Sequence, residues 1–409
     1  MKKAKDKLSP DLQNQIADHL KSGKPLLGAD SPISQMMQSA INAVLEGELA
    51  HHLSEDSAAA KKNKRNGSIS KRVISSLGEL EISTPRDRNS TFEPEFIAKR
   101  QRELNSGLND QIIALYAQGN SIEDVRRLIQ QMFGVSISAG KISAITDQVL
   151  PLVQEWRSRA LSAFYAILYL DAIHFKVRHN GKYGTRAFYT VYSIDLEGRR
   201  DILGLYLSEN ESATQWSLVM EDLKSRGVED VAVICTDNLS GFSNAIDQAF
   251  PEAVVQKCIV HQIRNSVRYV TDKERKEICA DLRTIYTAIS ETEAKVALEA
   301  LYAKWDKKLY YILDDWQNKW EELMAFMQFP KEMRRMIYTT NPVEAVHRVM
   351  RKLIKGKAAW TSETALLKQL YLSLMHNQKS WKRNAFKWKP ILYELIKTYG
   401  QRIEKHLIN

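Results

Sequence analysis

Residues 163–178 read AFYAILYLDAIHFKVR, an apolar run that ends abruptly at Asp171. A run that is apolar on both faces is typical of a central strand buried on two sides. An ionised carboxylate at its end is costly without a cation or hydrogen-bond partner. A second run, VAVICT at residues 231–236, ends the same way at Asp237. We therefore predict one site with two carboxylates, which a magnesium ion would neutralise because it prefers oxygen ligands.

The elements around these two runs predict the fold. Residues 186–195 and 199–208 are two further β runs, residues 214–226 have a helical pattern, and residues 240–250 form another short helical pattern. Three antiparallel strands followed by helix, strand and helix make a mixed α/β sheet, the layout of a ribonuclease H-like fold. We expect this domain to span residues 159–409.

The sequence has no pattern typical of β-strands between about residues 271 and 336. This segment is rich in Lys, Glu, Ala and Leu and includes Trp305, Trp316 and Trp320. The pattern predicts an all-helical insertion before the element that completes the site. Tryptophans at such positions belong to the core more often than to a stacking platform, so we interpret them as core residues.

The first 108 residues predict a region of helices and a hairpin that binds DNA. Residues 1–60 have apolar side chains at helical spacing, as in an amphipathic packing helix. The stretch KKNKRNGSISKR at residues 61–72, which includes Lys64 and Arg65, is either a solvated loop or an arm that contacts phosphates. Residues 73–85 alternate as in a short hairpin.

Residues 109–158 have the pattern of a helix-turn-helix. Ser121 and Asp124 can cap one helix, Gly134 is placed to end it, and Ser138 can begin a second helix. In a helix-turn-helix the second helix enters the major groove of DNA, although any two packed helices can imitate the pattern. The plausible outward contacts on the second helix are Lys141, Ser143 and Thr146.

Composition favours a polyanionic partner. The 409 residues include 59 Lys and Arg against 49 Asp and Glu, a net charge of +10. Nucleic acid is the commonest such partner, and a merely basic surface is the alternative. Three irregularly placed cysteines do not make a disulfide framework, and no apolar run approaches bilayer length. We therefore expect a soluble cytoplasmic protein.

A third carboxylate opens a later helix. In Asn341-Pro342-Val343-Glu344, Asn is a helix cap, Pro suits the first helical position, and Glu344 falls in the first turn. The helix dipole favours a Glu there without any catalytic role. However, several cations follow on the same side of the helix and could hold a phosphate backbone across a metal site. They are Arg348, Arg351 and Lys355.

Several sequence pieces, in order along the chain, carry a family resemblance. They are GELEISTPRDR (78–88), STFEPEF (90–96), LDAIHFKVR (170–178), RGVEDV (226–231), TDNLSGFSNAI (236–246), QKCIVHQIRN (256–265), YTTNPVEAVHR (338–348) and YGQRI (399–403). Together they closely resemble the Mutator-like transposases of bacterial insertion sequences, a DDE family. Separate motifs in the right order are far more specific than three isolated acids.

The resemblance implies metal-dependent DNA strand cleavage and strand transfer. Asp171, Asp237 and Glu344 would be the catalytic triad and the ligands of two Mg²⁺ or Mn²⁺ ions. The DNA partners would be terminal inverted repeats and target DNA, and bringing two ends together makes a homodimer the expected assembly. The residues expected to contact the DNA backbone are Arg348, Arg351 and Lys352.

Three features near the site depart from the family pattern or leave its role open. Asn238 stands where Gly is usual, and His347 stands where Asn is more usual. Cys258 and His261 form a Cys-x-x-His pair, but a structural zinc site needs four ligands and no second pair follows. We therefore interpret this pair as packing and hydrogen bonding near the active site, with zinc as the alternative.

Two alternatives to a transposase follow from the same residues. One is a ribonuclease H-like nuclease that hydrolyses DNA without strand transfer. The other is a transposase-derived DNA-binding protein with an inactive catalytic domain, which three intact acids argue against.

Overall fold

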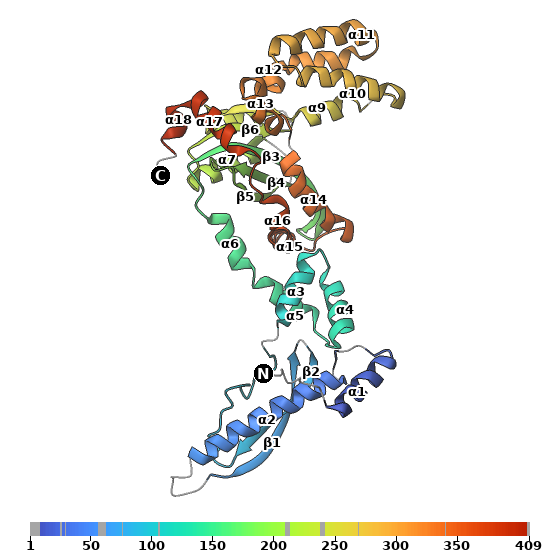
Figure 1. The fold of residues 1–409 in the computed structure, drawn as a ribbon, viewed down its shortest axis with the longest axis vertical. Coiled ribbons are helices and arrows are strands. Elements are labelled where there is room, and N and C mark those ends of the chain that lie inside the picture. The colour runs from blue at the N-terminus through green and yellow to red at the C-terminus, as the bar shows by residue number, and fades with distance from the viewer. Residues whose placement is uncertain are drawn as a thin grey trace, which may run out of the picture. The chain divides into compact units, whose positions relative to one another are not determined.

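The chain forms two compact units, residues 1–148 and residues 149–409. The computed structural model describes residues 9–24, 27–28, 30–55, 63–75, 77–104, 107–208, 213–237, 242–268, 270–339 and 341–406 (Figure 1). Among these residues, no helix combines the length and the apolar character needed to cross a bilayer.

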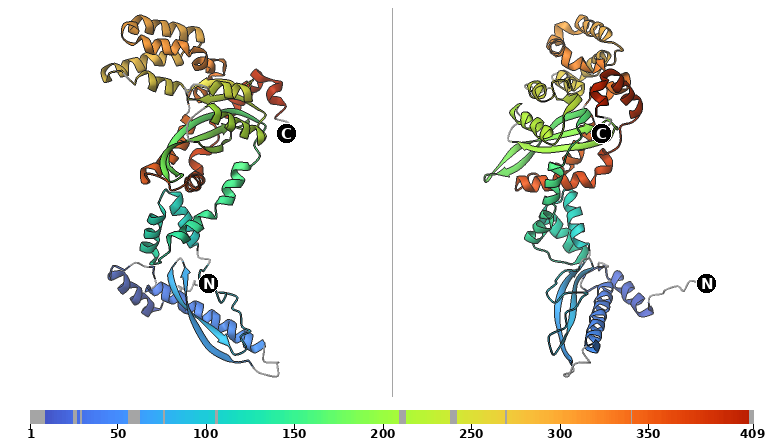
Figure 2. Two further views of the ribbon diagram at one scale, coloured as in Figure 1. Left: turned by 180° about the vertical axis from the view of Figure 1, so that it is seen from behind. Right: turned by 90° about the vertical axis from the view of Figure 1, so that its left-hand side faces the viewer.

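The first unit begins with a long helix packed on a hairpin. The elements are α1 (Pro10–Lys21), α2 (Pro32–Glu55), β1 (Arg65–Ser75) and β2 (Gly78–Asp87), and Figure 2 shows α2 lying along the two strands. The side chains buried between α2 and the hairpin include Ile41, Leu45, Val73, Leu80 and Ile82. The helical start and the hairpin are as predicted, but Met36, Met37 and Val44 of α2 are exposed.

The basic stretch at residues 61–72 is not simply a loop, which corrects that part of the prediction. From Arg65 onwards it forms strand β1, while Lys61 and Lys62 lie outside the described residues. The register shifts between Arg65 and Ser68, and Gly67 has a φ of 70°. Asn66-Gly67 therefore forms a bulge within the strand, since glycine adopts this φ without strain.

Three short helices complete the first unit: α3 (Leu108–Ala117), α4 (Ile122–Phe133) and α5 (Ala139–Asp147). The Ser121 side chain accepts from the Asp124 backbone N–H and the Asp124 side chain completes the capping box. Gly134 ends α4 in the left-handed region, and the Ser138 side chain caps α5. Helix α4 begins and ends, and α5 begins, where the sequence predicted.

The second unit is built on a mixed sheet, as predicted, to which the unpredicted strand β7 adds a fifth member. Helix α6 (Leu150–Ser158) precedes it. The strands are β3 (Phe164–His179), β4 (Lys182–Ile194), β5 (Arg200–Ser208), β6 (Asp230–Thr236) and β7 (Val254–Lys257). Their order across the sheet is β5-β4-β3-β6-β7. The pairs β3–β4 and β4–β5 are antiparallel, whereas β3–β6 and β6–β7 are parallel. The first apolar run is therefore the central strand, buried on both faces.

Different helices cover the two faces of the sheet. Tyr165, Leu168 and Leu170 of β3 belong to a core that includes side chains of α7 (Ala213–Ser225) and α8 (Phe242–Ala249). The opposite face, with Ile167 and Tyr169, belongs to a larger core that includes later helices. They include α14 (Asn341–Gly356), α15 (Glu363–His376), α16 (Gln378–Trp381), α17 (Trp388–Tyr399) and α18 (Gln401–Glu404).

The described part of residues 271–336 is helical, as expected. The elements after β7 are α9 (Ile259–Ser266), α10 (Asp272–Tyr286), α11 (Glu291–Asn318), α12 (Trp320–Met324), the short 3₁₀ helix η2 (Ala325–Gln328) and α13 (Lys331–Ile337). Helix α11 bends at Leu309, whose φ and ψ are not helical. Trp305, Trp316 and Trp320 are at most 9% exposed, which confirms their interpretation as core residues.

Candidate active site

The parallel pairing of β3 and β6 brings two acids side by side. Leu170 of β3 is in register with Thr236 of β6, and each strand continues directly into an aspartate. Asp171 is only 6% exposed, and the Asp237 side chain is 22% exposed. The predicted placement of two carboxylates at neighbouring central strands is therefore observed.

The two carboxyl groups have opposite electrostatic surroundings. Burial raises the pKa of Asp171, but the nearby His347 side chain outweighs this effect and leaves the pKa below its ordinary value. Nδ1 of His347 lies 3.2 Å from Oδ2 of Asp171. Burial and the negative charge of Asp171 raise the pKa of Asp237. When two carboxyl groups lie side by side, one ionises readily, and its negative charge raises the pKa of the other.

Helix α9 lies against the second acid. Its N-cap residue Cys258 is fully buried, and His261 one turn later places Nδ1 2.6 Å from Oδ1 of Asp237. Burial lowers the pKa of His261, but Asp237 and Cys258 together raise it to about 10. The raised pKa reflects the close contact of the His261 imidazole with the carboxylate of Asp237.

Helix α14 connects the third carboxylate, Glu344, to the two aspartates through intermediate side chains. Glu344 and His347 are three residues apart, so they share one face of the helix. His347 is fully buried between Asp171 and Thr190, whose Oγ1 is 3.1 Å from Nε2. Oε1 of Glu344 lies 2.8 Å from Nη2 of Arg264 on α9. Glu344 thus joins the two aspartates through residues of α9 and α14.

The site offers donor atoms suited to a divalent ion. Asp237 Oδ1, His261 Nδ1 and His347 Nδ1 are buried and make no hydrogen bond of good geometry within the described part of the chain, although each imidazole nitrogen lies within ion-pair distance of an aspartate. Carboxylate oxygens and imidazole nitrogens are donor atoms that a divalent ion can accept. Three carboxylates supply the oxygen donors that Mg²⁺ and Mn²⁺ accept. Cys258 Sγ, His261 and Asp237 also have ligand atoms within 4.8 Å of one another.

Exposed cations extend from this site along α14. Arg348, Arg351 and Lys352 are all exposed, and none of them is ion-paired with a described residue. Their charge is therefore available to an external anion.

The side chains predicted to contact DNA in the first unit have mixed placements. Lys64 and Arg65 are exposed at the start of β1, where Arg65 pairs with Glu46 at 2.5 Å. Lys141 is exposed on α5 and its Nζ lies 2.8 Å from Glu103. Ser143 is half-buried.

The outward placement predicted for Thr146 is wrong. Its side chain is fully buried, and its hydroxyl donates to the Ser143 carbonyl at 2.9 Å. Thr146 lies one turn beyond Ile142 and next to Ile145, both of which face the core, so the helical repeat turns it inward.

Sequence reasoning missed two residues that hold the carboxylates. His347 was noted only as a departure from the family pattern, and Arg264 was not singled out. Helical spacing was the available signal, because Arg264 follows His261 by one turn and His347 follows Glu344 by one turn. Asn238 lies outside the described residues.

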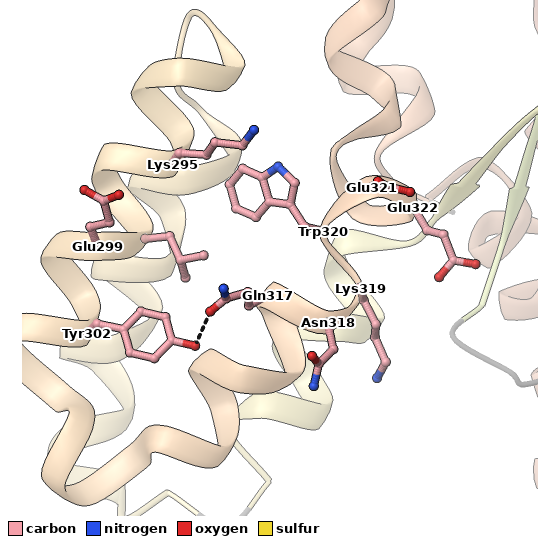
Figure 3. Close-up of a pocket in the computed structure, with 10 residues that line it drawn as sticks. Lys295, Glu299, Tyr302, Gln317, Asn318, Lys319, Trp320, Glu321 and Glu322 are labelled. Carbon is pink, nitrogen blue, oxygen red and sulfur yellow. Dashed lines mark hydrogen bonds between the residues drawn. The ribbon is translucent and has the colours of Figure 1, made fainter.

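A separate cavity of about 570 Å³ lies between α11 and α12 (Figure 3). Lys295, Glu299, Tyr302 and Trp320 line it, and the Tyr302 hydroxyl donates to Gln317 at 2.9 Å. None of its lining residues belongs to the carboxylate cluster.

Comparison with known proteins shows which family this chain is similar to. The model of a family described as "Transposase, Mutator family" matches residues 10–384. The probable transposase for an ISRM3-like insertion sequence element of Sinorhizobium fredii is 35% identical over 96% of this chain and 99% of its own length. The transposase for insertion sequence element ISRM3 of Rhizobium meliloti is 34% identical over the same shares. A Drosophila P element transposase strand transfer complex covers 71% of this chain and 85% of its own, with 8% identity and a TM-score of 0.30.

The two insertion-sequence relatives are described as transposases, and both match this chain over nearly its whole length. The chain belongs to the Mutator family of transposases.

Proposed function

We propose that the protein binds the terminal inverted repeats of an insertion sequence and catalyses metal-dependent strand cleavage and strand transfer. The observation that carries this proposal is that Asp171 and Asp237 end the paired strands β3 and β6, while Glu344 begins α14, whose His347 contacts Asp171. The order β5-β4-β3-β6-β7 is also what a ribonuclease H-like sheet requires. The helical residues 271–336 would be the insertion that precedes the glutamate.

The three carboxylates would hold two Mg²⁺ or Mn²⁺ ions. When bound, such ions supply an activated water and stabilise the leaving 3′ oxygen. The chain itself places the acids: β3 and β6 fix the aspartates, and His347 orients Asp171. Hydrolysis would free a 3′-OH, which then attacks a second phosphodiester without a covalent protein intermediate.

The basic surfaces of both units would bind DNA. In residues 109–158, α4 and α5 would act as a helix-turn-helix, with Lys141 and Ser143 toward the bases. Lys64 and Arg65 would contact phosphates from the preceding region, residues 1–108. On the catalytic region, residues 159–409, the backbone contacts would be Arg348, Arg351 and Lys352. A homodimer at the nucleoid would bring two ends together.

Substitution of the first aspartate tests the proposal. In Asp171→Asn we expect strand cleavage in Mg²⁺ to be lost while binding of the repeat ends is retained, because the aspartate lies in the catalytic region rather than on the predicted DNA-reading helices. Cleavage and gel-shift assays on the same end fragment measure both. Retained cleavage would contradict the triad.

A labelled DNA with a free 3′-OH separates a transposase from the two alternatives. A transposase joins this end to target DNA. A nuclease cleaves in the presence of a divalent ion but gives no joined product, and a DNA-binding derivative does neither.

A further inference from the structure

Helix α9 presents two basic side chains to two carboxylates that come from other elements. His261 meets Asp237 at the end of β6, and Arg264, one turn later, meets Glu344 on α14. Nη1 of Arg264 is also 3.4 Å from Nε2 of His261. A single turn of α9 therefore contacts two members of the proposed triad.

The contact between Arg264 and Glu344 differs from the others in its exposure. The Arg264 side chain is 55% exposed, whereas that of Glu344 is 21% exposed and that of His347 is 1% exposed. A guanidinium that is half in solvent can leave its carboxylate at little cost, because exposed ion pairs contribute little stability. Among the described side chains that contact the three acids, Arg264 is thus the one that can move away without disrupting the core.

A divalent ion at Glu344 and the guanidinium on Glu344 oppose each other. Oε1 is 2.8 Å from Nη2, so an ion on this carboxylate would lie within a few ångströms of a like charge. Repulsion at such a distance is unfavourable even near the protein surface. A DNA phosphate, in contrast, offers the two-pronged geometry that arginine binds well.

We propose that Arg264 is a positioning residue that ties Glu344 to α9 in the ion-free chain, competes there with the metal ion, and yields the carboxylate when it turns to a DNA phosphate. The inference rests on the proposed function, since it takes Glu344 as a metal ligand. By linkage, DNA binding then strengthens metal binding, and metal binding strengthens DNA binding by the same factor.

Mn²⁺ titration of the full chain, by calorimetry or electron paramagnetic resonance, tests the competition. We expect Arg264→Met to tighten Mn²⁺ binding by about two- to fivefold, the range that an exposed ion pair allows. Arg264→Lys keeps the charge and should stay within about twofold of the wild-type affinity. Arg199→Met is the matched control, because Arg199 is also exposed and also paired, with Asp195 at 2.7 Å, and should leave the affinity unchanged.

The same substitution in a Glu344→Gln background separates competition for this carboxylate from a general effect of charge. With the carboxylate gone, Arg264→Met should no longer change Mn²⁺ affinity. Equal tightening in both backgrounds, or no tightening in either, overturns the proposal. In the presence of a repeat-end duplex the wild-type affinity should rise, and that rise should shrink in Arg264→Met; an equal rise in both chains also overturns it.

Failure of the proposed function looks different in these titrations. A wild-type chain that binds no Mn²⁺ would overturn the metal-dependent function itself and this inference with it. A wild-type chain that binds Mn²⁺ through Asp171 and Glu344 but is indifferent to Arg264 would overturn the inference alone. Circular dichroism of each variant shows whether the fold is intact, and a tighter Mn²⁺ affinity is a result that a merely structural loss does not give.

Discussion

At the scale of single residues, the carboxylate cluster is stabilised by the cations around it. Asp171 is almost fully buried, and a buried carboxylate without a cation is strongly destabilising. His347 meets it with Nδ1 and contacts Thr190 with Nε2. One imidazole therefore links α14 to both β3 and β4, where Asp171 and Thr190 are paired in register.

Substitutions of His347 should separate these two contacts. His347→Ala leaves the buried carboxylate of Asp171 without its imidazole partner, and we expect a loss of about 3–5 kcal/mol in the free energy of unfolding of the ion-free chain. In His347→Asn the amide can still donate to Asp171, so the loss should be smaller, about 1–3 kcal/mol for the contact left unmade at Thr190. Urea unfolding measures both variants. Equal losses in the two would show that the contact with Asp171 contributes nothing.

The sequence predicted the acids of the site better than their partners. Asp171 and Asp237 were identifiable because each ends a buried apolar run, and Glu344 needed the family motif because a first-turn glutamate is unremarkable by itself. Arg264 and His347 act across tertiary contacts, which no local pattern encodes. Thr146 was misplaced because polarity alone was taken as a sign of exposure, whereas its position in the helical repeat decides its burial.

At the scale of elements, the two ends of helix α4 were predictable, but the start of strand β1 was not. The capping box at Ser121 and the left-handed Gly134 are local chemistry, so they could be identified from the sequence. Strand β1 begins earlier than expected because residues 65–70 are exposed on both faces. Such a strand lacks the alternation of apolar and polar residues by which strands are recognised.

Helix α5 carries the exposed Lys141, which is predicted to contact DNA. Lys141→Ala should weaken binding to the repeat ends and reduce the slope of log affinity against log salt by about one, because one phosphate or base contact is lost. Thr146→Val, on the same helix, should leave affinity unchanged because Thr146 is buried. Gel shifts at several salt concentrations measure both. A reduced slope for Thr146→Val with none for Lys141→Ala would contradict the assignment of the exposed face.

At the scale of the whole molecule, the candidate site lies entirely within the second unit. Asp171, Asp237 and Glu344 all fall within residues 149–409, whereas the predicted helix-turn-helix lies largely in residues 1–148. Strands β3 to β6 followed from the apolar runs in the sequence, whereas the short strand β7 did not. The long helical stretch before Glu344 could be recognised only as a loss of strand signals, and its packing on the larger core is a tertiary result.

Metal binding should therefore stabilise the two units unequally. Mn²⁺ at a hundred times its dissociation constant should stabilise the second unit by about 2.7 kcal/mol, and the first unit should not respond. Hydrogen exchange of the full chain with Mn²⁺ and after chelation measures each unit separately. Asp171→Asn should abolish the difference. Equal protection of both units would mean that the ion binds outside the carboxylate cluster.

Helix α14 carries both the third carboxylate and the exposed cations. An α-helix rises about 1.5 Å per residue and does not stretch, so Arg348 and Arg351 lie about 6 and 10 Å along the axis from Glu344. Under the proposed function, the helix would fix the distance between the reacting phosphate and the backbone beyond it. One inserted residue after His347 would turn the cations by about 100° away from the carboxylate, so the length and phase of α14 would set which phosphate is cut.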